Sequence, residues 1–384
     1  MLFRSEAAYP TLAKRFQIGS TRQGRPIWAL KISDNVALDE NETPVLFDGN
    51  IHAREFGTPE VCLHIINDLL TTYATNPTRR AWVDNLEIYV IACLNPDGRN
   101  VCDSINANWR KNARDNNGNG IFDANYDGVD LNRNATFLWG SDNLGSSPNP
   151  WDITYRGPSA GSEPETQAFL SLLRRIRPAF HLTIHSYQGS FLTPYADVNA
   201  VSPQPEQVRS LGASMAAVSR TENGEAYAIY GNHQFVYTVN GDTSDEAYAH
   251  QGAFSVVVEI GVSGFQPLYA TTRDKIIPGL RPGWEKLLAA AYDSHPRLHG
   301  RILDALGRPV PARIDLLDIT RPNDEHWETR WDGRYDAPMR AAGTYRLRVT
   351  PLARPAMALE RSITFDAGPV RWDIFFGADR WIIY

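Results

Sequence analysis

The chain has 384 residues, of which 42% are hydrophobic and 21% charged, so it has the composition of a globular protein that can bury a large core. Its length predicts two or three domains. The net charge of −6 argues against a nucleic-acid binder, and no apolar run reaches the ~18 residues that a membrane-spanning helix needs.

The amino-terminal stretch MLFRSEAAYPTLAKRF lacks the apolar segment of a secretory signal peptide. The chain is therefore either cytoplasmic or a secreted or periplasmic protein whose signal has been removed, and we expect the second. The cysteines Cys62, Cys93 and Cys102 leave at least one thiol unpaired, and no CxxC motif occurs. Neither a disulfide framework nor a thiolate zinc site is expected.

Apolar runs rich in β-branched residues predict strands buried on both faces, as in a mostly parallel sheet. These strands are expected at residues 26–33, 43–49, 86–95, 179–187 and 253–261. Helices are expected at residues 6–17, from Thr58 as N-cap, at 162–177 with Ser162 and Glu165 in capping-box spacing, and at 279–293. Strands that alternate with helices indicate an α/β domain, with a mixed, mostly parallel central sheet flanked by helices.

Two regions differ from this pattern. Residues 98–160 are rich in Asn, Asp, Gly and Pro, and a loop of this length is usually functional. After about residue 297, apolar and polar residues alternate between Gly and Pro turns, which predicts a small all-β sandwich of short antiparallel strands. We therefore expect an α/β domain over residues 1–297 and a β-sandwich domain over residues 298–384.

The segment GNIHARE places His52 and Glu55 three residues apart, directly after a predicted strand. Both side chains are zinc ligands, and a catalytic zinc site usually combines three protein ligands with water. A solvated turn is the alternative. His181 and His185 lie about 13 Å apart if they are four residues apart on a strand, so only one can join the site. His185 is nearer the carboxyl end of the strand, where sites of α/β sheets form, and His181 should be a buried structural histidine.

Several charged residues have two interpretations each. Glu259 comes near the end of an apolar strand, where a carboxylate is either a general base or the partner of an arginine. Arg110 and Arg114 in WRKNAR, and Asn132 and Arg133 in DLNRN, are either solvated or form a clamp that grips a carboxylate.

Together these motifs resemble the zinc metallocarboxypeptidases of the pancreatic carboxypeptidase A and B type. The matching strings run in the order GNIHARE, NPDGR, NWRKNAR, GVDLNRN, RGPSAGSEPET, HSYQG and VVVEIG, and the resemblance covers residues 9 to about 290. It implies a zinc-dependent exopeptidase that removes the C-terminal residue of peptides or proteins.

The resemblance also implies a role for each matching position. The expected zinc ligands are His52, Glu55 and His185, with Asp130 as hydrogen-bond partner of a ligand histidine. Glu259 is the expected general base, and Arg110 the group that polarises the scissile carbonyl. The implied substrate-binding residues are Asn132 and Arg133 on the terminal carboxylate, the mobile Tyr237, the accessory Arg54 and the subsite residue Tyr187.

The segment NGDTSDEAY departs from the family pattern. Ser244 takes the position that separates apolar-preferring from basic-preferring enzymes, with Asp242 nearby. Glu246 replaces the usual tryptophan. The string GDTSD is similar to the loop of broad-specificity bacterial carboxypeptidases, so the preferred C-terminal side chain stays open.

The segment DNNGNGIFD resembles a calcium-binding loop, with candidate ligands Asp115, Asn117, Asn119 and Asp123. The acid expected at the twelfth position is Tyr126, with Asp127 one place late. An Asn/Gly turn is the alternative to calcium.

The C-terminal region resembles the transthyretin-like domain of one branch of the family. We expect it to be a folding or interaction module. Three functions remain open: an active carboxypeptidase, a zinc amidase that trims cell-wall peptides, and an inactive binding module. The complete set of His52, Glu55, His185, Arg110 and Glu259 favours the first.

Overall fold

The computed structural model describes residues 2–198, 200–202, 205–231, 237–293, 297–318, 325–338, 342–365, 369–377 and 381–383. An eight-stranded sheet forms the centre of the larger part of the chain, in the order β1-β2-β4-β3-β5-β8-β6-β7. Its strands are β1 (Ala13–Ser20), β2 (Pro26–Ile32), β3 (Thr43–Gly49), β4 (Leu86–Ile91), β5 (Phe180–His185), β6 (Ser190–Thr193), β7 (Ala228–Gly231) and β8 (Phe254–Glu259).

The middle of this sheet is parallel, because β4, β3, β5 and β8 pair in the same direction. On one side β1 and β2 are antiparallel, and on the other β6 runs antiparallel to β8. Every residue of β3, β4 and β5 is buried, as expected for strands covered on both faces. The prediction of a mixed, mostly parallel sheet flanked by helices is confirmed.

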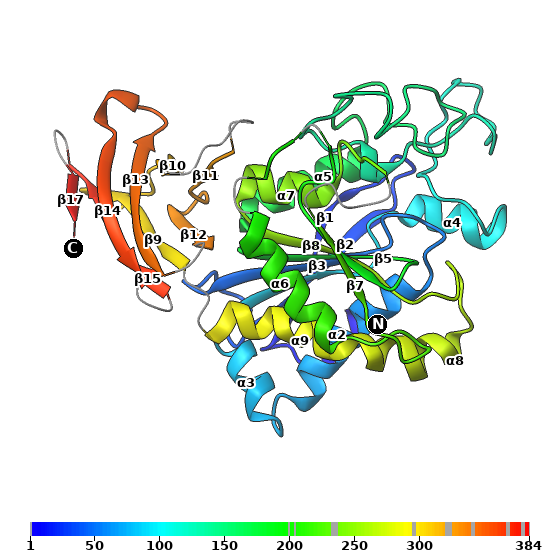
Figure 1. Ribbon diagram of the computed structural model, residues 1–384, viewed down its shortest axis with the longest axis horizontal. Coiled ribbons are helices and arrows are strands. Elements are labelled where there is room, and N and C mark those ends of the chain that lie inside the picture. Colours follow the sequence, from blue (N-terminus) through cyan, green and yellow to red (C-terminus); the bar gives the residue numbers. More distant parts are fainter. Residues whose placement is uncertain are drawn as a thin grey trace.

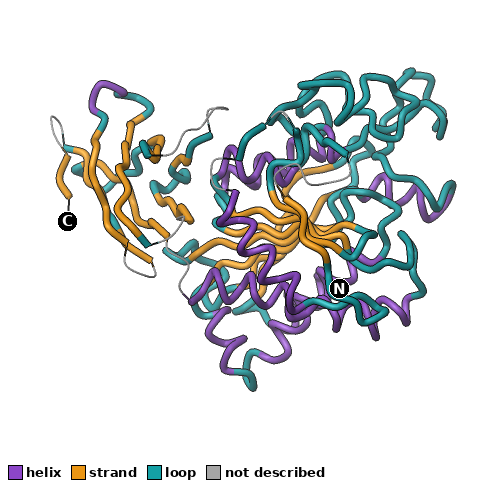
Figure 2. The backbone as a smooth tube through the Cα atoms, in the orientation of Figure 1, coloured by secondary structure: helices purple, strands orange, loops and turns teal. Residues whose placement is uncertain are grey.

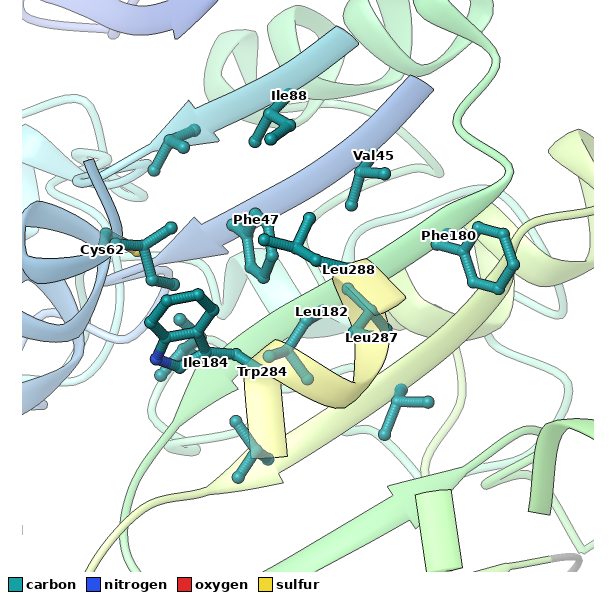
Figure 3. Close-up of a cluster of buried hydrophobic side chains, with 14 of the residues drawn as sticks. Val45, Phe47, Cys62, Ile88, Phe180, Leu182, Ile184, Trp284, Leu287 and Leu288 are labelled. Atoms are coloured by element: carbon teal, nitrogen blue, oxygen red, sulfur yellow. The ribbon is translucent and has the colours of Figure 1, made fainter. Parts of the chain in front are cut away.

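Helices cover both faces of the sheet, which Figure 2 shows as a central layer of strands. On β3, Val45 and Phe47 join the core on one face, and Leu46 joins the core on the other. Figure 3 shows the first of these cores, where Trp284 packs near Phe47 and Leu182. The helices are α1 (Leu2–Ala8), α2 (Gly57–Thr72), α3 (Pro77–Val83), α4 (Pro96–Ser104), α5 (Pro164–Ile176), α6 (Pro205–Val218), α7 (Thr243–Gln251), α8 (Tyr269–Thr271) and α9 (Ile277–Asp293), with short turns η1 (Leu131–Arg133) and η2 (Thr272–Ile276).

Beyond α9, two sheets pack face to face around a separate core that includes Leu298, Ile314 and Leu347 (Figure 1). One has the order β11-β10-β13-β14, and the other has β12-β9-β16-β17 with β15 also beside β9. The strands are β9 (Arg297–Asp304), β10 (Ala312–Leu316), β11 (Trp327–Glu328), β12 (Arg334–Pro338), β13 (Gly343–Pro351), β14 (Leu359–Phe365), β15 (Pro369–Arg371), β16 (Ile374–Phe376) and β17 (Trp381–Ile383), with η3 at Pro355–Met357.

The predicted sandwich is therefore confirmed, although β15 and β16 run parallel to β9 and not antiparallel. The division at residues 297 and 298 and the transthyretin-like topology stay predictions. Among the described residues, none of the helices combines the length and the apolar character that a membrane crossing requires.

The predicted helix over residues 6–17 is wrong. Helix α1 ends at Ala8, and β1 begins at Ala13. Pro10 explains the break, because the residue before a proline is disfavoured in the helical conformation. Beyond it, Phe16 and Ile18 pack against a sheet core while β1 pairs with β2. Tertiary pairing thus overrides the local helical pattern.

Both predicted helix caps are also wrong. Helix α2 begins one residue before Thr58, whose hydroxyl donates to the Glu55 carbonyl. Helix α5 follows Glu163 as N-cap, and the Ser162 hydroxyl donates to the Glu163 carboxylate. Strand β4 stops at Ile91, and the predicted loop over residues 98–160 contains most of α4. The short strands β6 and β7 and the helices α6 and α7 were not predicted.

Candidate active site

The turn between β3 and α2 is shaped by Asn50, which has a positive φ of 55°. Asparagine tolerates this left-handed conformation because its short side chain bonds locally. Here its Nδ2 donates to the carbonyl oxygens of His52, Ala53 and Glu55, at 3.1, 3.3 and 3.4 Å. The amide therefore holds the HARE segment as a tight turn.

Three predicted ligand side chains meet beside this turn. His52 Nδ1 lies 2.8 Å from Glu55 Oε1 and 3.1 Å from His185 Nδ1, and His185 Nδ1 lies 3.5 Å from Glu55 Oε2. All three residues are buried. Two imidazole nitrogens and a carboxylate that face one another at these distances could hold a metal ion. The cluster therefore has the donor set of a metal site.

Asp130 connects the cluster to Arg110. Its Oδ1 lies 3.3 Å from His52 Nε2, without the alignment of a full hydrogen bond, and its Oδ2 accepts a 2.9 Å hydrogen bond from Arg110 Nε. Burial alone would raise the pKa of Asp130, but the guanidinium groups of Arg110 and Arg133 hold it well below its usual value. Asp130 is thus an anion that fixes both neighbours.

The two residues of the predicted carboxylate clamp, Asn132 and Arg133, are each held by hydrogen bonds to other parts of the protein. Asn132 Oδ1 accepts hydrogen bonds from the backbone N–H and the hydroxyl of Thr243, at 3.1 and 3.0 Å. Arg133 Nε donates to the Gly145 carbonyl at 2.8 Å. Both side chains line the same cavity as His52 and Glu55, so their donor groups are oriented before a ligand binds.

Glu259 is the last residue of β8 and pairs in register with His185, the last residue of β5. The two side chains therefore leave the sheet at the same edge. Burial raises the pKa of the Glu259 carboxyl to about 7, although nearby His185 and Arg110 oppose the shift. Within the described part of the chain, no arginine forms an ion pair with Glu259. The alternative of a simple arginine partner is therefore not supported.

The cavity that contains these residues has a volume of about 430 Å³. Its mouth is aromatic: Tyr187 and Tyr237 are 43% and 54% exposed, and the Tyr187 ring meets the Phe265 ring edge-on at 4.8 Å. The Arg54 guanidinium lies 3.9 Å from the centre of the Phe265 ring. The predicted substrate residues Arg54, Tyr187 and Tyr237 thus lie around the entrance.

The buried end of the cavity is acidic. Asp242, Ser244 and Asp245, from the start of α7, line it and are at most 4% exposed. Asp242 caps the helix by accepting from the Asp245 N–H, and Asp245 Oδ2 accepts from the Ala196 N–H at 3.0 Å. Burial raises the pKa of both carboxyls, and their proximity adds to the rise for Asp245. The sequence indicated Asp242 and Ser244 but missed Asp245.

Glu246 lies outside the residues that line the cavity. Its Oε2 accepts from the Thr136 N–H, the Thr136 hydroxyl and the Phe137 N–H, at 3.0, 2.7 and 2.7 Å. The residue that replaces the expected tryptophan therefore ties α7 to the segment that follows Arg133.

Residues 1–285 match the family model described as zinc carboxypeptidase, which is most of the chain.

The chain belongs to the zinc carboxypeptidase family. A zinc carboxypeptidase of Saccharothrix mutabilis subsp. capreolus is 34% identical over 248 residues, which are 58% of this chain and 52% of that protein. Carboxypeptidase O of Bos taurus is 30% identical over 259 residues, 67% of this chain and 66% of that protein. The chain thus spans about half to two thirds of the length of these curated relatives. The crystal structure of carboxypeptidase A from Helicoverpa armigera superposes with a TM-score of 0.65, at 27% identity, covering 76% of this chain and 71% of that one.

The buried cluster fits the zinc ion on which this family depends. Ligand atoms about 2.0–2.2 Å from a tetrahedral zinc are roughly 3.3 Å from one another. The separations of 2.8, 3.1 and 3.5 Å among His52, Glu55 and His185 are close to this value.

A buried chain of hydrogen bonds behind the cluster was not predicted. His181 Nε2 lies 2.6 Å from Asp48 Oδ2, so the prediction of a buried structural histidine is confirmed. The Thr183 hydroxyl donates to Asp48 Oδ1 at 2.9 Å and lies 3.3 Å from His185 Nε2. The chain continues from His181 Nδ1 to Ser255 at 2.8 Å and on to Ser244 at 2.9 Å. A signal existed in the sequence, because residues 181, 183 and 185 share one face of a strand.

The candidate calcium loop has its side-chain oxygens engaged by backbone N–H groups. Asp115 accepts from Gly118 and Gly120, each at 2.7 Å. The side chains of Asn117, Asn119 and Asp123 accept from Asn119, Ile121 and Asn125, respectively. This pattern is what an Asn/Gly turn requires, and calcium binding stays a prediction.

Proposed function

We propose that this protein removes the C-terminal residue of peptides or proteins, with His52, Glu55 and His185 as its zinc ligands. The observation that carries the proposal is the convergence of these three side chains, with contacts of 2.8–3.5 Å between the two Nδ1 atoms and the Glu55 carboxylate oxygens, in a cavity also lined by Glu259 and Arg110. Family membership supports the reaction class.

The bound zinc would polarise the scissile carbonyl and make water acidic enough to attack at neutral pH. In our proposal Glu259 accepts the proton of the attacking water and delivers it to the leaving amine. Arg110, held by Asp130, donates to the carbonyl oxygen as negative charge develops there.

The clamp makes the enzyme an exopeptidase. Arg133 and Asn132 would bind the free α-carboxylate of the substrate, with Arg54 as an accessory contact and Tyr237 closing over it. A peptide segment that has no free α-carboxylate here would leave the Arg133 guanidinium without a partner. Tyr187 would contact the residues upstream of the scissile bond.

The acidic inner end of the cavity suggests the substrate side chain. Asp242 and Asp245 are buried there, and a cation placed beside a buried carboxyl group favours its charged form and pairs with it. We therefore expect C-terminal lysine or arginine to be cleaved best. Protonated carboxyls would still admit apolar side chains.

The decisive experiment is a panel of peptides that differ in their last residue, assayed with zinc removed and then restored. Glu259→Gln should lower kcat by about 10²- to 10⁴-fold and retain about one equivalent of zinc. Glu225→Gln, at an exposed position, is the matched control. Unchanged hydrolysis by Glu259→Gln would show the mechanism to be wrong. A wild-type protein without zinc near one equivalent would exclude an active zinc enzyme.

The same peptides separate the alternatives. The family model and the relatives named above are carboxypeptidases, so an amidase for cell-wall peptides is not favoured. Turnover of cell-wall peptides alone would reverse that order, and no turnover at all would indicate a binding module. The secreted or periplasmic location remains our expectation.

Calcium is a separate proposal. If the loop from Asp115 to Asp123 binds calcium, added Ca²⁺ should raise the thermal midpoint, and Asp115→Ala should abolish the rise. An identical midpoint with Ca²⁺ and with a chelator would favour the plain turn.

A further inference from the structure

The segment from Glu325 to Glu328 in the C-terminal sandwich lies against elements that build the cavity. Strand β11, part of this segment, contacts α7, and Figure 1 shows the sandwich beside one end of that helix. The other end of α7 carries Asp242 and Ser244 at the cavity. Helix α7 therefore connects the sandwich directly to the cavity.

The first connection runs through Tyr195, which is fully buried. Its hydroxyl donates a 3.0 Å hydrogen bond to Glu325 Oε1, and its ring stacks on Phe137 at 4.8 Å. The residues on either side of it, Pro194 and Ala196, line the cavity. Ala196 also donates its N–H to Asp245. Any displacement of Tyr195 therefore moves the cavity wall.

The second connection is at the carboxyl end of α7. Gly252 ends the helix with a φ of 73°, and a Cβ atom there would lie 1.5 Å from the Trp327 indole nitrogen. Trp327 thus occupies the space that any other residue would need. In addition, Arg177 pairs with Glu328 at 2.6 Å and donates to the His250 carbonyl at 3.2 Å. The sandwich therefore fixes one end of α7 by packing and by charge.

A third group of contacts joins the sandwich to β4 and to the loop that follows β2. Arg330 pairs with Glu87 at 3.2 Å, and Arg334 donates to the carbonyl oxygens of Asp39 and Glu40. None of these residues is among those that line the cavity in the described part of the chain. Variants of these contacts can therefore serve as controls for variants of the contacts that lie near the cavity.

We propose that the C-terminal sandwich positions the substrate side-chain pocket, with Glu325 and Trp327 as positioning residues that act through Tyr195 and α7. This inference rests on the proposed function, because it gives the acidic end of the cavity the role of binding the C-terminal side chain. The sandwich then contributes to substrate affinity and preference, beyond its contribution to stability.

The test compares full-length variants on peptides ending in lysine or leucine. Glu325→Ala removes the acceptor of the Tyr195 hydroxyl. It should raise KM about tenfold, change the preference between the two peptides and leave kcat within about threefold. Glu325→Gln retains an acceptor oxygen and should restore KM. Arg334→Ala, the matched control, should lower the thermal midpoint and leave KM unchanged.

Tyr195→Phe removes the hydroxyl and keeps the ring, so it tests the contact if Glu325→Ala does not fold. We expect KM to rise in the same direction. Unchanged KM in these variants, or an equal rise in Arg334→Ala, would overturn the inference and leave the sandwich a stabilising module. The wild-type protein separates the two claims. If it does not hydrolyse the peptides, the proposed function is wrong, whereas if it does and the variants match it, only the role of the sandwich is wrong.

Discussion

Replacing Thr183 with valine removes one hydroxyl from the hydrogen-bonded chain behind the proposed zinc ligands and keeps the shape of the side chain. The hydroxyl donates to Asp48 Oδ1 at 2.9 Å, so its oxygen is left to accept from His185 Nε2 at 3.3 Å. That arrangement places the proton of His185 on Nε2 and leaves the lone pair of Nδ1 for the metal. Thr183→Val removes the acceptor that selects this tautomer.

The loss should be visible in metal affinity. Removing the outer partner of a metal-bound histidine typically weakens metal binding about 10- to 100-fold, which is about 1.4–2.7 kcal/mol. The metal-free protein should also lose about 1–3 kcal/mol of unfolding free energy, because buried Asp48 loses one of its donors. Asp48 keeps its contact with His181, so the fold should survive.

Competition with a chromogenic chelator measures the zinc dissociation constant without relying on turnover. Thr166→Val is the matched control, because Thr166 is buried and its hydroxyl has no hydrogen-bond partner in the described part of the chain. Its zinc affinity should equal that of the wild type. If Thr183→Val binds zinc within twofold of the wild type, the hydroxyl does not position His185, and the reasoning is refuted.

Two further predictions concern buried acids. Burial raises the pKa of Glu165 to about 7, and nearby Glu163 adds to the rise. The protonated carboxyl therefore contributes fully to the stability of the fold below the unfolded pKa of 4.5, and this contribution is lost as the pH rises to about 7. Between these pH values the wild type should lose up to about 3 kcal/mol of unfolding free energy relative to Glu165→Gln in urea titrations, and parallel curves would contradict this. Asp245→Asn should lower kcat/KM for C-terminal lysine at least about tenfold more than for leucine, since it removes the buried carboxyl group that a lysine ammonium would hold in its ionised form. An equal effect on both peptides would assign Asp245 a structural role only.

Local patterns were sufficient where a feature depends on neighbours in the chain. The apolar runs around Phe47, Val90 and Ile184 predicted buried strands because strands covered on both faces need apolar residues at every position. His52 and Glu55 could be predicted as candidate metal ligands because they lie within one turn of the chain. The short elements β6, β7 and α7 were missed because four to nine residues carry too little periodicity to separate strand, helix and loop.

Contacts between segments that are distant in the sequence could not be predicted. Asp245 belongs to the cavity only because α7 places it beside Ala196, and Thr183 reaches Asp48 only because β3 and β5 are neighbours in register. The sequence by itself determined the HARE motif that carries two of the proposed zinc ligands, the mostly parallel sheet and the presence of a β-sandwich, since each depends on local spacing. The tertiary structure decided which acids line the pocket, how His185 is held and where Glu325 meets Tyr195, because these contacts join segments that only the folded chain brings together.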